Sequence, residues 1–259
     1  MRAGIFQCAG GGLTPHQRLA RLEAHLEQHD LDIVVCPELF MSGYNIGACV
    51  TTLAEPDDGE FAVSVSNLAK TNETAIVYGY PELDGDDIFN SALCIGADGK
   101  VLANYRKMLP PPGFEARYFS GGDGPSLFEI DGIKCAILIC YDAEFPESVR
   151  AVAEAGAQIV IVPTALVDNW HAVAFQLMPT RAFENGVWLL YANHAGEEGD
   201  AKYLGGSCII APDGTDKARA GSGEALIAAK IDVEANARAQ ARLPYLADVQ
   251  ALRKKLNLI

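Results

Sequence analysis

Cys140 is the residue of this sequence whose surroundings most clearly indicate chemistry. It follows the apolar run 137–139, which predicts a strand, and Pro146 soon afterwards marks the first turn of a helix. A side chain at such a strand-to-helix turn lies at the sheet edge beside a helix N-terminus, whose partial positive charge favours a thiolate. We therefore predict a nucleophilic Cys140. The cysteines within predicted strands are instead expected to be small core residues: Cys8, Cys36, Cys94 and Cys135.

Two charged residues stand just beyond other predicted strands. Glu38 follows the buried run 33–36, and Lys107 follows 101–106. Ligand sites of α/β sheets gather at the carboxyl ends of strands. A thiol nucleophile also needs a base, and histidine is the familiar one. The sequence does not exclude His171 or His194 from that role.

The elements that must position these residues alternate between strands and helices. Two similar halves with buried strands favour two sheets packed face to face with helices outside, a four-layer α-β-β-α sandwich of the α/β class. Composition alone does not distinguish this sandwich from an ordinary three-layer fold. Asp-Gly turns predict hairpins at 98–99, at 131–132 and at 213–214, the last joining strand 208–211 to strand 225–231. The predicted helices are 16–29, 60–70, 146–155 and 170–185.

No linker or low-complexity segment divides the chain, so residues 1–259 are predicted to form one domain. The tail 244–259 has leucine and valine residues at helical spacing. A lone helix cannot bury such a stripe, so we expect the tail to pack on this subunit or at a subunit interface.

Composition narrows the class of protein. The net charge is −14, from 20 basic and 34 acidic residues, which disfavours binding to nucleic acid. No apolar run approaches the roughly 20 residues of a membrane helix, and the first residues do not resemble a signal peptide. The seven scattered cysteines include no CxxC pair, which indicates a reducing cytoplasm and argues against a zinc-thiolate site.

In combination, Cys36-Pro37-Glu38-Leu39-Phe40, Tyr105-Arg106-Lys107 and Ile139-Cys140-Tyr141-Asp142 resemble the nitrilase superfamily of carbon–nitrogen hydrolases. The resemblance covers nearly the whole chain and implies the α-β-β-α sandwich. It also implies homodimers or larger homo-oligomers and a site without a metal or organic cofactor.

The resemblance assigns the catalytic roles as follows. Cys140 is the nucleophile, Glu38 the general base, and Lys107 the cation that faces the developing oxyanion. Glu115 corresponds to the second glutamate of the family, which positions the substrate and the lysine. The backbone N–H of Tyr141 is the second oxyanion donor.

The residues after the nucleophile indicate the branch. Nitrile-cleaving relatives typically have Cys-Trp-Glu, whereas Cys140-Tyr141-Asp142 resembles amidases, in particular bacterial 5-aminovaleramide-type and stereoselective amidases. Glu144 stands where many relatives that act on carboxylate-bearing amides have an arginine. It could attract a substrate ammonium, or it could serve only the helix N-terminus. We therefore expect a small aliphatic or amino-substituted primary amide as substrate.

Three other functions stay open at this point: an N-carbamoyl amine or amino acid hydrolase with the same triad of Glu38, Lys107 and Cys140, a nitrilase, and a non-catalytic binding module. The prolines after Met108 also depart from the relatives, which leaves the shape of the pocket open. The predicted pocket residues are Phe40, Tyr44, Phe114, Phe119, Tyr141, Thr164, Ala165 and Trp170.

Overall fold

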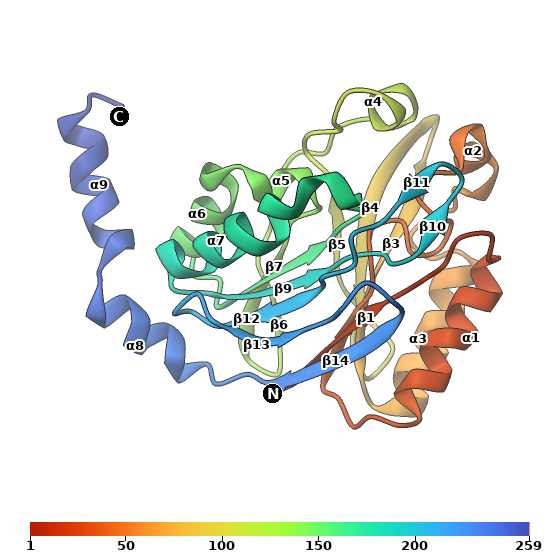
Figure 1. The fold of residues 1–259 in the computed structure, drawn as a ribbon, viewed down its shortest axis with the longest axis horizontal. Coiled ribbons are helices and arrows are strands. Elements are labelled where there is room, and N and C mark those ends of the chain that lie inside the picture. The colour runs from red at the N-terminus through yellow and green to blue at the C-terminus, as the bar shows by residue number, and fades with distance from the viewer. Residues whose placement is uncertain (259) are drawn as a thin grey trace.

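Two six-stranded sheets form the centre of the molecule in the computed structural model, which describes residues 1–258 (Figure 1). The first sheet has the order β14-β1-β2-β3-β4-β5. Its strands are β1 (Arg2–Gln7), β2 (Ile33–Val35), β3 (Ala75–Asp84), β4 (Asp87–Ile95), β5 (Val101–Arg106) and β14 (Ala225–Lys230).

The second sheet has the order β13-β12-β9-β8-β7-β6. Its strands are β6 (Phe128–Ile130), β7 (Ile133–Ile137), β8 (Ile159–Pro163), β9 (Trp188–Ala192), β12 (Cys208–Ile210) and β13 (Asp216–Arg219). In both sheets three central strands run parallel, β1-β2-β3 and β7-β8-β9, and antiparallel strands flank them. The parallel strands end at the same edge, where the loops that follow them can meet.

Helices cover the outer face of each sheet (Figure 1). The helices α1 (Pro15–Leu26) and α3 (Glu60–Asn72) lie on the first sheet, and α5 (Tyr141–Glu144), α6 (Pro146–Glu154) and α7 (Met178–Asn185) lie on the second. Strand β2 shows why four layers form. Ile33 and Val35 belong to the apolar cluster that includes strands of both sheets, whereas Val34 joins the cluster of the outer helices. The predicted four-layer sandwich is confirmed.

The predicted final hairpin is wrong in its second strand. The Pro212-Asp213-Gly214 turn leads into β13, which pairs with β12. Strand β14 crosses instead to the first sheet and pairs antiparallel with β1, from Arg2 opposite Lys230 to Gln7 opposite Ala225. Residues 220–224 form the crossing, and β14 thereby completes the edge of the first sheet.

The predicted helix 170–185 is divided into three pieces. A short 3-10 turn, η2 (Asp168–Trp170), precedes a π-helical turn, η3 (Val173–Leu177), and α7 follows. Pro179 lies in the first turn of α7, where its missing N–H prevents a regular continuation from the preceding turn. Further elements that sequence patterns did not predict are η1 (Gly47–Cys49), α2 (Val50–Leu53), α4 (Phe114–Tyr118), β10 (Glu197–Glu198), β11 (Ala201–Lys202) and α8 (Glu234–Arg242).

The tail forms helix α9 (Tyr245–Lys255), which projects from the body of the molecule beside α6 and α7 (Figure 1). Arg253 pairs with Glu154 of α6 at 2.9 Å, but no residue of α9 is buried, and Leu252 and Leu256 are more than half exposed. The part of the tail at residue 259 lies outside the described residues. Across residues 1–258, the helices are all too short or too polar to cross a membrane.

Candidate active site

The three predicted catalytic residues come from three strand ends. Glu38 follows β2, Lys107 follows β5, and Cys140 stands shortly after β7. The end of β8 holds two of these loops, because the Glu38 amide donates to the Thr164 carbonyl at 3.4 Å and the Cys140 amide donates to the Pro163 carbonyl at 2.9 Å. The loops of the two sheets are thereby held over one strand end.

Gly79 in β3 makes room for the Glu38 loop. A Cβ at this position would lie 2.2 Å from the Leu39 nitrogen and 2.8 Å from the Glu38 Cα. Those distances are impossible for real atoms in contact, so any side chain at position 79 would push the base away. Leu39 itself has a positive φ of 48°, which turns the chain sharply after Glu38.

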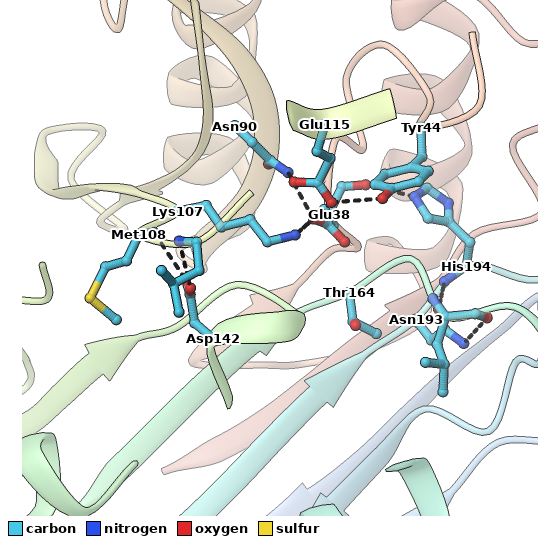
Figure 2. Close-up of polar contacts among 12 residues, drawn as sticks. Glu38, Tyr44, Asn90, Lys107, Met108, Glu115, Asp142, Thr164, Asn193 and His194 are labelled. Carbon is cyan, nitrogen blue, oxygen red and sulfur yellow. Dashed lines mark hydrogen bonds and ion pairs between the residues drawn. The ribbon is translucent and has the colours of Figure 1, made fainter. Parts of the chain in front are cut away.

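Lys107 lies between two carboxylates (Figure 2). Its Nζ is 2.7 Å from Oε1 of Glu38 and 2.7 Å from Oε1 of Glu115, and none of the three side chains is exposed. Burial alone would lower the pKa of Lys107, but the negative charges of Glu38 and Glu115 raise it above its ordinary range. Lys107 is therefore a fixed positive charge in a dry site.

Asn90 joins the two glutamates from the other side (Figure 2). Its Nδ2 donates to Oε1 of Glu38 at 2.7 Å and to Oε2 of Glu115 at 2.8 Å. Burial raises the pKa of Glu38 to about 7, although Lys107 and Asn90 act in the opposite direction. Oε2 of Glu38 has no hydrogen-bond partner among the described residues. Glu38 therefore has a free oxygen and a pKa suited to taking a proton near neutral pH.

Glu115 is held by three donors. It lies in α4, which follows Gly113 with its φ of 108°. Besides Lys107 and Asn90, the Tyr44 hydroxyl donates to Oε1 of Glu115 at 2.6 Å. Each Glu115 oxygen thus accepts at least one hydrogen bond. This arrangement suits a carboxylate that positions its neighbours rather than one that acts as a base.

Cys140 has a strained backbone, with φ 46° and ψ −105°. Non-glycine residues in sparsely populated regions of φ and ψ cluster at functional sites. The thiol is half-buried, and burial and the Glu38 charge raise its pKa, against the effects of Lys107, Thr164 and the Ala165 amide.

This pKa corrects the sequence-based expectation of a thiolate. The helix after Cys140 has only one turn, Tyr141–Glu144, and its dipole does not offset burial. The resting nucleophile is a thiol, so attack on a substrate requires transfer of its proton to a base.

Two groups close to Cys140 can donate hydrogen bonds. Lys107 supplies the charge, and Tyr141, as the first residue of α5, has a backbone N–H with no partner inside the helix. Prearranged donors of this kind stabilise charge that develops during attack on a carbonyl group.

Asp142 has a supporting role that its position after the nucleophile did not reveal. Its carboxylate accepts from the Tyr105 hydroxyl at 2.6 Å. It also accepts from the amides of Met108 and Leu109 at 3.3 and 3.1 Å, and Figure 2 shows Met108 beside Asp142. It thereby fixes the chain on both sides of Lys107 to the turn that carries Cys140.

The structure brings several of the predicted pocket residues to the site. Thr164 and the Ala165 amide lie beside the Cys140 thiol, and Tyr44 reaches Glu115. Phe114 packs against Tyr44 with ring centres 5.4 Å apart. Phe119 packs on Phe114, and Tyr141 packs on Phe145.

One pocket prediction is wrong. Phe40 is fully buried on the helix side of the first sheet, between Phe6 and Phe61, because the chain turns at Leu39. Trp170 is 60% exposed on η2, and its place in the pocket stays a prediction.

Neither candidate histidine is placed as the base of Cys140. His171 stacks on Phe175 at the surface, with ring centres 5.9 Å apart. His194 is buried, and its Nε2 lies 2.7 Å from the carbonyl oxygen of Glu38 (Figure 2). Burial and the Arg18 charge lower the pKa of His194 to about 4, so the ring is neutral near pH 7. It supports the backbone of the base.

Comparison with known proteins agrees with this site. Residues 2–240 match the family described as Carbon-nitrogen hydrolase. A "Hydrolase in pqqF 5'region" from Pseudomonas protegens is 42% identical over 252 residues, covering 96% of this chain and 88% of that protein. The "2-oxoglutaramate amidase" of Bacillus subtilis is 31% identical and covers 91% of this chain and 92% of its own length.

Among solved structures, an amidase from Nesterenkonia sp. superposes with a TM-score of 0.85 at 30% identity, over 94% of each chain. In a mutant of the Nesterenkonia sp. AN1 amidase, acrylamide is attached to the active-site cysteine by Michael addition. The chain belongs to the carbon–nitrogen hydrolase family, within the nitrilase superfamily of amidases and nitrilases, and is a hydrolase.

Proposed function

We propose that this protein is a cysteine-dependent amidase that converts a small aliphatic or amino-substituted primary amide to a carboxylic acid and ammonia. The observation that carries the proposal is the buried arrangement of Glu38, Lys107 and Glu115 beside Cys140. The covalent adduct at the active-site cysteine of the Nesterenkonia amidase supports the role of Cys140 as nucleophile.

The reaction begins with attack of the Cys140 sulfur on the amide carbon. The thiol proton passes to Oε2 of Glu38, and the charge that forms on the amide oxygen is stabilised by Lys107 and the Tyr141 N–H. The carbon–nitrogen bond then breaks, and Glu38 returns its proton to the leaving nitrogen, so ammonia departs and a thioester remains.

Water completes the cycle. Glu38 takes a proton from water as the oxygen attacks the thioester carbon, the carbon–sulfur bond breaks, and the proton returns to the Cys140 sulfur. The sum is one amide and one water consumed, with one acid and one ammonia released. Glu115 holds Lys107 throughout and takes no proton.

Glu144 supports an amino-substituted substrate. It ends α5, four positions after the nucleophile, and within residues 1–258 its carboxylate has no hydrogen bond or ion pair. Its backbone carbonyl accepts from Arg181 at 2.7 Å, which fixes the turn. Burial raises the pKa of Glu144, against the charges of Lys107 and Arg181. An unpaired, partly buried carboxylate is a suitable partner for an ammonium group.

A matched set of amides tests this proposal. 5-Aminovaleramide, hexanamide and the monoamide of adipic acid have similar lengths and differ in end-group charge, and ammonia release is measured for each. We expect the cationic amide to have the highest kcat/KM, and Glu144→Gln to reduce its advantage over hexanamide by about 10-fold. Hydrolysis of nitriles but of none of the amides would contradict the proposal.

The N-carbamoyl hydrolase is the alternative with the same triad. It releases carbon dioxide together with ammonia, so measurement of both products from N-carbamoyl amines and from amides separates the two. The similarity to the 2-oxoglutaramate amidase of Bacillus subtilis favours the amidase.

We also propose that the protein works as a homodimer. Leu252 in α9 and Leu256 and Leu258 after it are more than half exposed and give the end of the tail apolar surface. Light scattering on the purified chain is expected to give the mass of two subunits, and a monomer that retains full activity would contradict this.

A further inference from the structure

A second buried charged network lies behind the catalytic residues, and the mechanism above does not use it. Its centre is the carboxylate of Glu198 in β10. Oε1 of Glu198 lies 3.0 Å from Nη2 of Arg18 in α1, and the two side chains are 6% and 1% exposed. A buried ion pair is costly to form and contributes little to stability by itself, so its presence needs a reason.

The second oxygen of Glu198 holds the loop that carries Tyr44. Oε2 accepts from the amides of Tyr44 and Asn45 at 2.9 and 2.7 Å, and from the Tyr203 hydroxyl at 2.7 Å. With Arg18, four donors converge on one carboxylate. Burial would raise the pKa of Glu198, but these hydrogen bonds and charges hold it below its ordinary value, so the group is an anion.

The fit around this pair is tight. Gly43, with φ 92°, precedes Tyr44, and a Cβ there would lie 2.3 Å from Oε1 of Glu198 and 2.7 Å from Nη2 of Arg18. A Cβ at Gly10 would lie 2.0 Å from Nη1 of Arg18. Two glycines therefore let the backbone close over the ion pair, which leaves the Tyr44 loop little freedom.

The network reaches the catalytic residues by two short routes. Through Tyr44, the hydroxyl donates to Glu115, which in turn contacts Lys107 at 2.7 Å. Through Tyr203, the ring packs on His194 with centres 5.0 Å apart, and His194 contacts the Glu38 carbonyl. Glu198 therefore holds Tyr44 and Tyr203, and through these two residues the network reaches Glu115 and Glu38.

We propose that Glu198, paired with Arg18, is a positioning residue that fixes the Tyr44 loop and thereby places Glu115 and Lys107 for the reaction. The inference rests on the proposed amidase function. Glu198 does not contact the reacting atoms, so its removal affects catalysis only through Tyr44 and, to a lesser extent, His194. The effect therefore falls on kcat more than on KM.

A double-mutant cycle between Glu198→Gln and Tyr44→Phe tests the proposal. Tyr44→Phe removes the hydroxyl that reaches Glu115 and leaves the backbone amide in place. We expect each single variant to lower kcat by about 10-fold to 100-fold with KM changed by less than about threefold, since small misplacements of catalytic groups have effects of this size. In the double variant kcat should be within about threefold of the worse single variant, because both changes break the same route.

The pH dependence of kcat/KM tests the positioning role separately, because a loss of stability alone would not shift it. If Lys107 is held less firmly, it stabilises the Glu38 carboxylate less, and the acidic limb of kcat/KM moves to higher pH. Asn236→Ala is the matched control. Asn236 is buried in α8 and donates to the carbonyls of Gln158 and Gly186, and within residues 1–258 its side chain makes no hydrogen bond to a catalytic residue. It should lower Tm and leave kcat and the pH profile unchanged.

A milder variant keeps the test decisive if Glu198→Gln does not fold. Tyr203→Phe removes one donor from Oε2 of Glu198 and should lower kcat by about 3-fold to 10-fold. When it is combined with Tyr44→Phe, the two reductions in kcat should again not multiply. Folded variants with kcat within about twofold of the parent, or effects that multiply in the double variant, would overturn the proposal.

A chemical readout separates this inference from the proposed function. The rate at which iodoacetamide alkylates Cys140 is followed by peptide mass spectrometry in a Cys49→Ser background, because Cys49 is exposed. Glu198→Gln should slow this alkylation by about 10-fold, since it depends on Glu38 and Lys107 and needs no turnover. Slowed alkylation in a protein that hydrolyses no amide would leave the positioning role standing and contradict the function alone. Unchanged alkylation in an active amidase would contradict the positioning role alone.

Discussion

The Nζ of Lys107 lies 2.7 Å from Oε1 of Glu38, and neither side chain is exposed to solvent. This ion pair, completed by Glu115, is the electrostatic centre of the site. Each partner keeps the other charged in a place where an isolated charge would be neutralised. Several expected outcomes follow from this pair and from the groups around it.

Replacing Lys107 should damage both folding and activity. Lys107→Met leaves Glu38 and Glu115 buried without their cation, which is expected to lower the free energy of unfolding by about 3–5 kcal/mol. Ammonia release should fall by at least about 10²-fold, because the charge that faces the oxyanion is gone. Chemical denaturation and activity assays measure the two effects. Lys100→Met is the matched control, since Lys100 is 80% exposed on a surface turn and should alter neither quantity.

The activity should fall on the acidic side of neutral pH. Glu38 must be ionised to take the thiol proton, and its pKa is raised to about 7, so kcat/KM should halve near that pH and fall tenfold for each further unit of acidity. A profile that stays flat down to pH 5 would exclude Glu38 as the base in this form.

Asn90→Ala should move that acidic limb. The Asn90 amide donates to Glu38 and favours its charged form, so its removal raises the pKa of Glu38 further and shifts the limb to higher pH. A shift to lower pH, or none in a variant that folds, would show that Asn90 does not act on the base.

The backbone of Cys140 should store strain that glycine relieves. Cys140 has φ 46°, and such conformations cost a non-glycine residue about 1–3 kcal/mol. We expect the inactive Cys140→Gly variant to unfold at a higher urea concentration than the inactive Cys140→Ser variant, in which the strain remains. Equal midpoints, or a lower one for the glycine variant, would show that the turn is not strained.

His194 should make the fold sensitive to acid. Its pKa is lowered to about 4 in the folded state, against about 6.5 in an unfolded chain, so between these values the unfolded state binds the additional proton. This contribution to stability is complete above pH 6.5 and is lost as the pH falls towards 4. Thermal unfolding of parent and His194→Gln at pH 5 and pH 8 measures it. The parent should lose more Tm between the two pH values than the variant, and an equal loss would contradict the assignment.

The sequence predicted the triad because each member stands at the end of a strand with strong local signals. Apolar runs before Glu38, Lys107 and Cys140 place all three at sheet edges, and the motifs resembled one family. The four layers were predicted from the two similar halves of the chain and from the resemblance to that family.

What the sequence did not reveal depends on contacts between distant segments. Asn90 lies 52 positions from Glu38, and Glu198 lies 154 positions from Tyr44, with nothing in the local pattern to link them. Phe40 was predicted to line the pocket, but the positive φ of Leu39 directs it into the core. The pairing of β14 with β1 was missed because a turn signal predicts a hairpin without specifying which later strand completes it.

The central claim is that Cys140 forms a thioester with the acyl part of a primary amide. Rapid acid quench of the enzyme during turnover of 5-aminovaleramide, followed by peptide mass spectrometry, tests it most directly. We expect the peptide containing Cys140 to carry one acyl group in an amount matched by an initial burst of ammonia, and we expect Cys140→Ser to show neither. Steady ammonia release with no acyl group on Cys140, together with near-parental activity of Cys140→Ser, would contradict it.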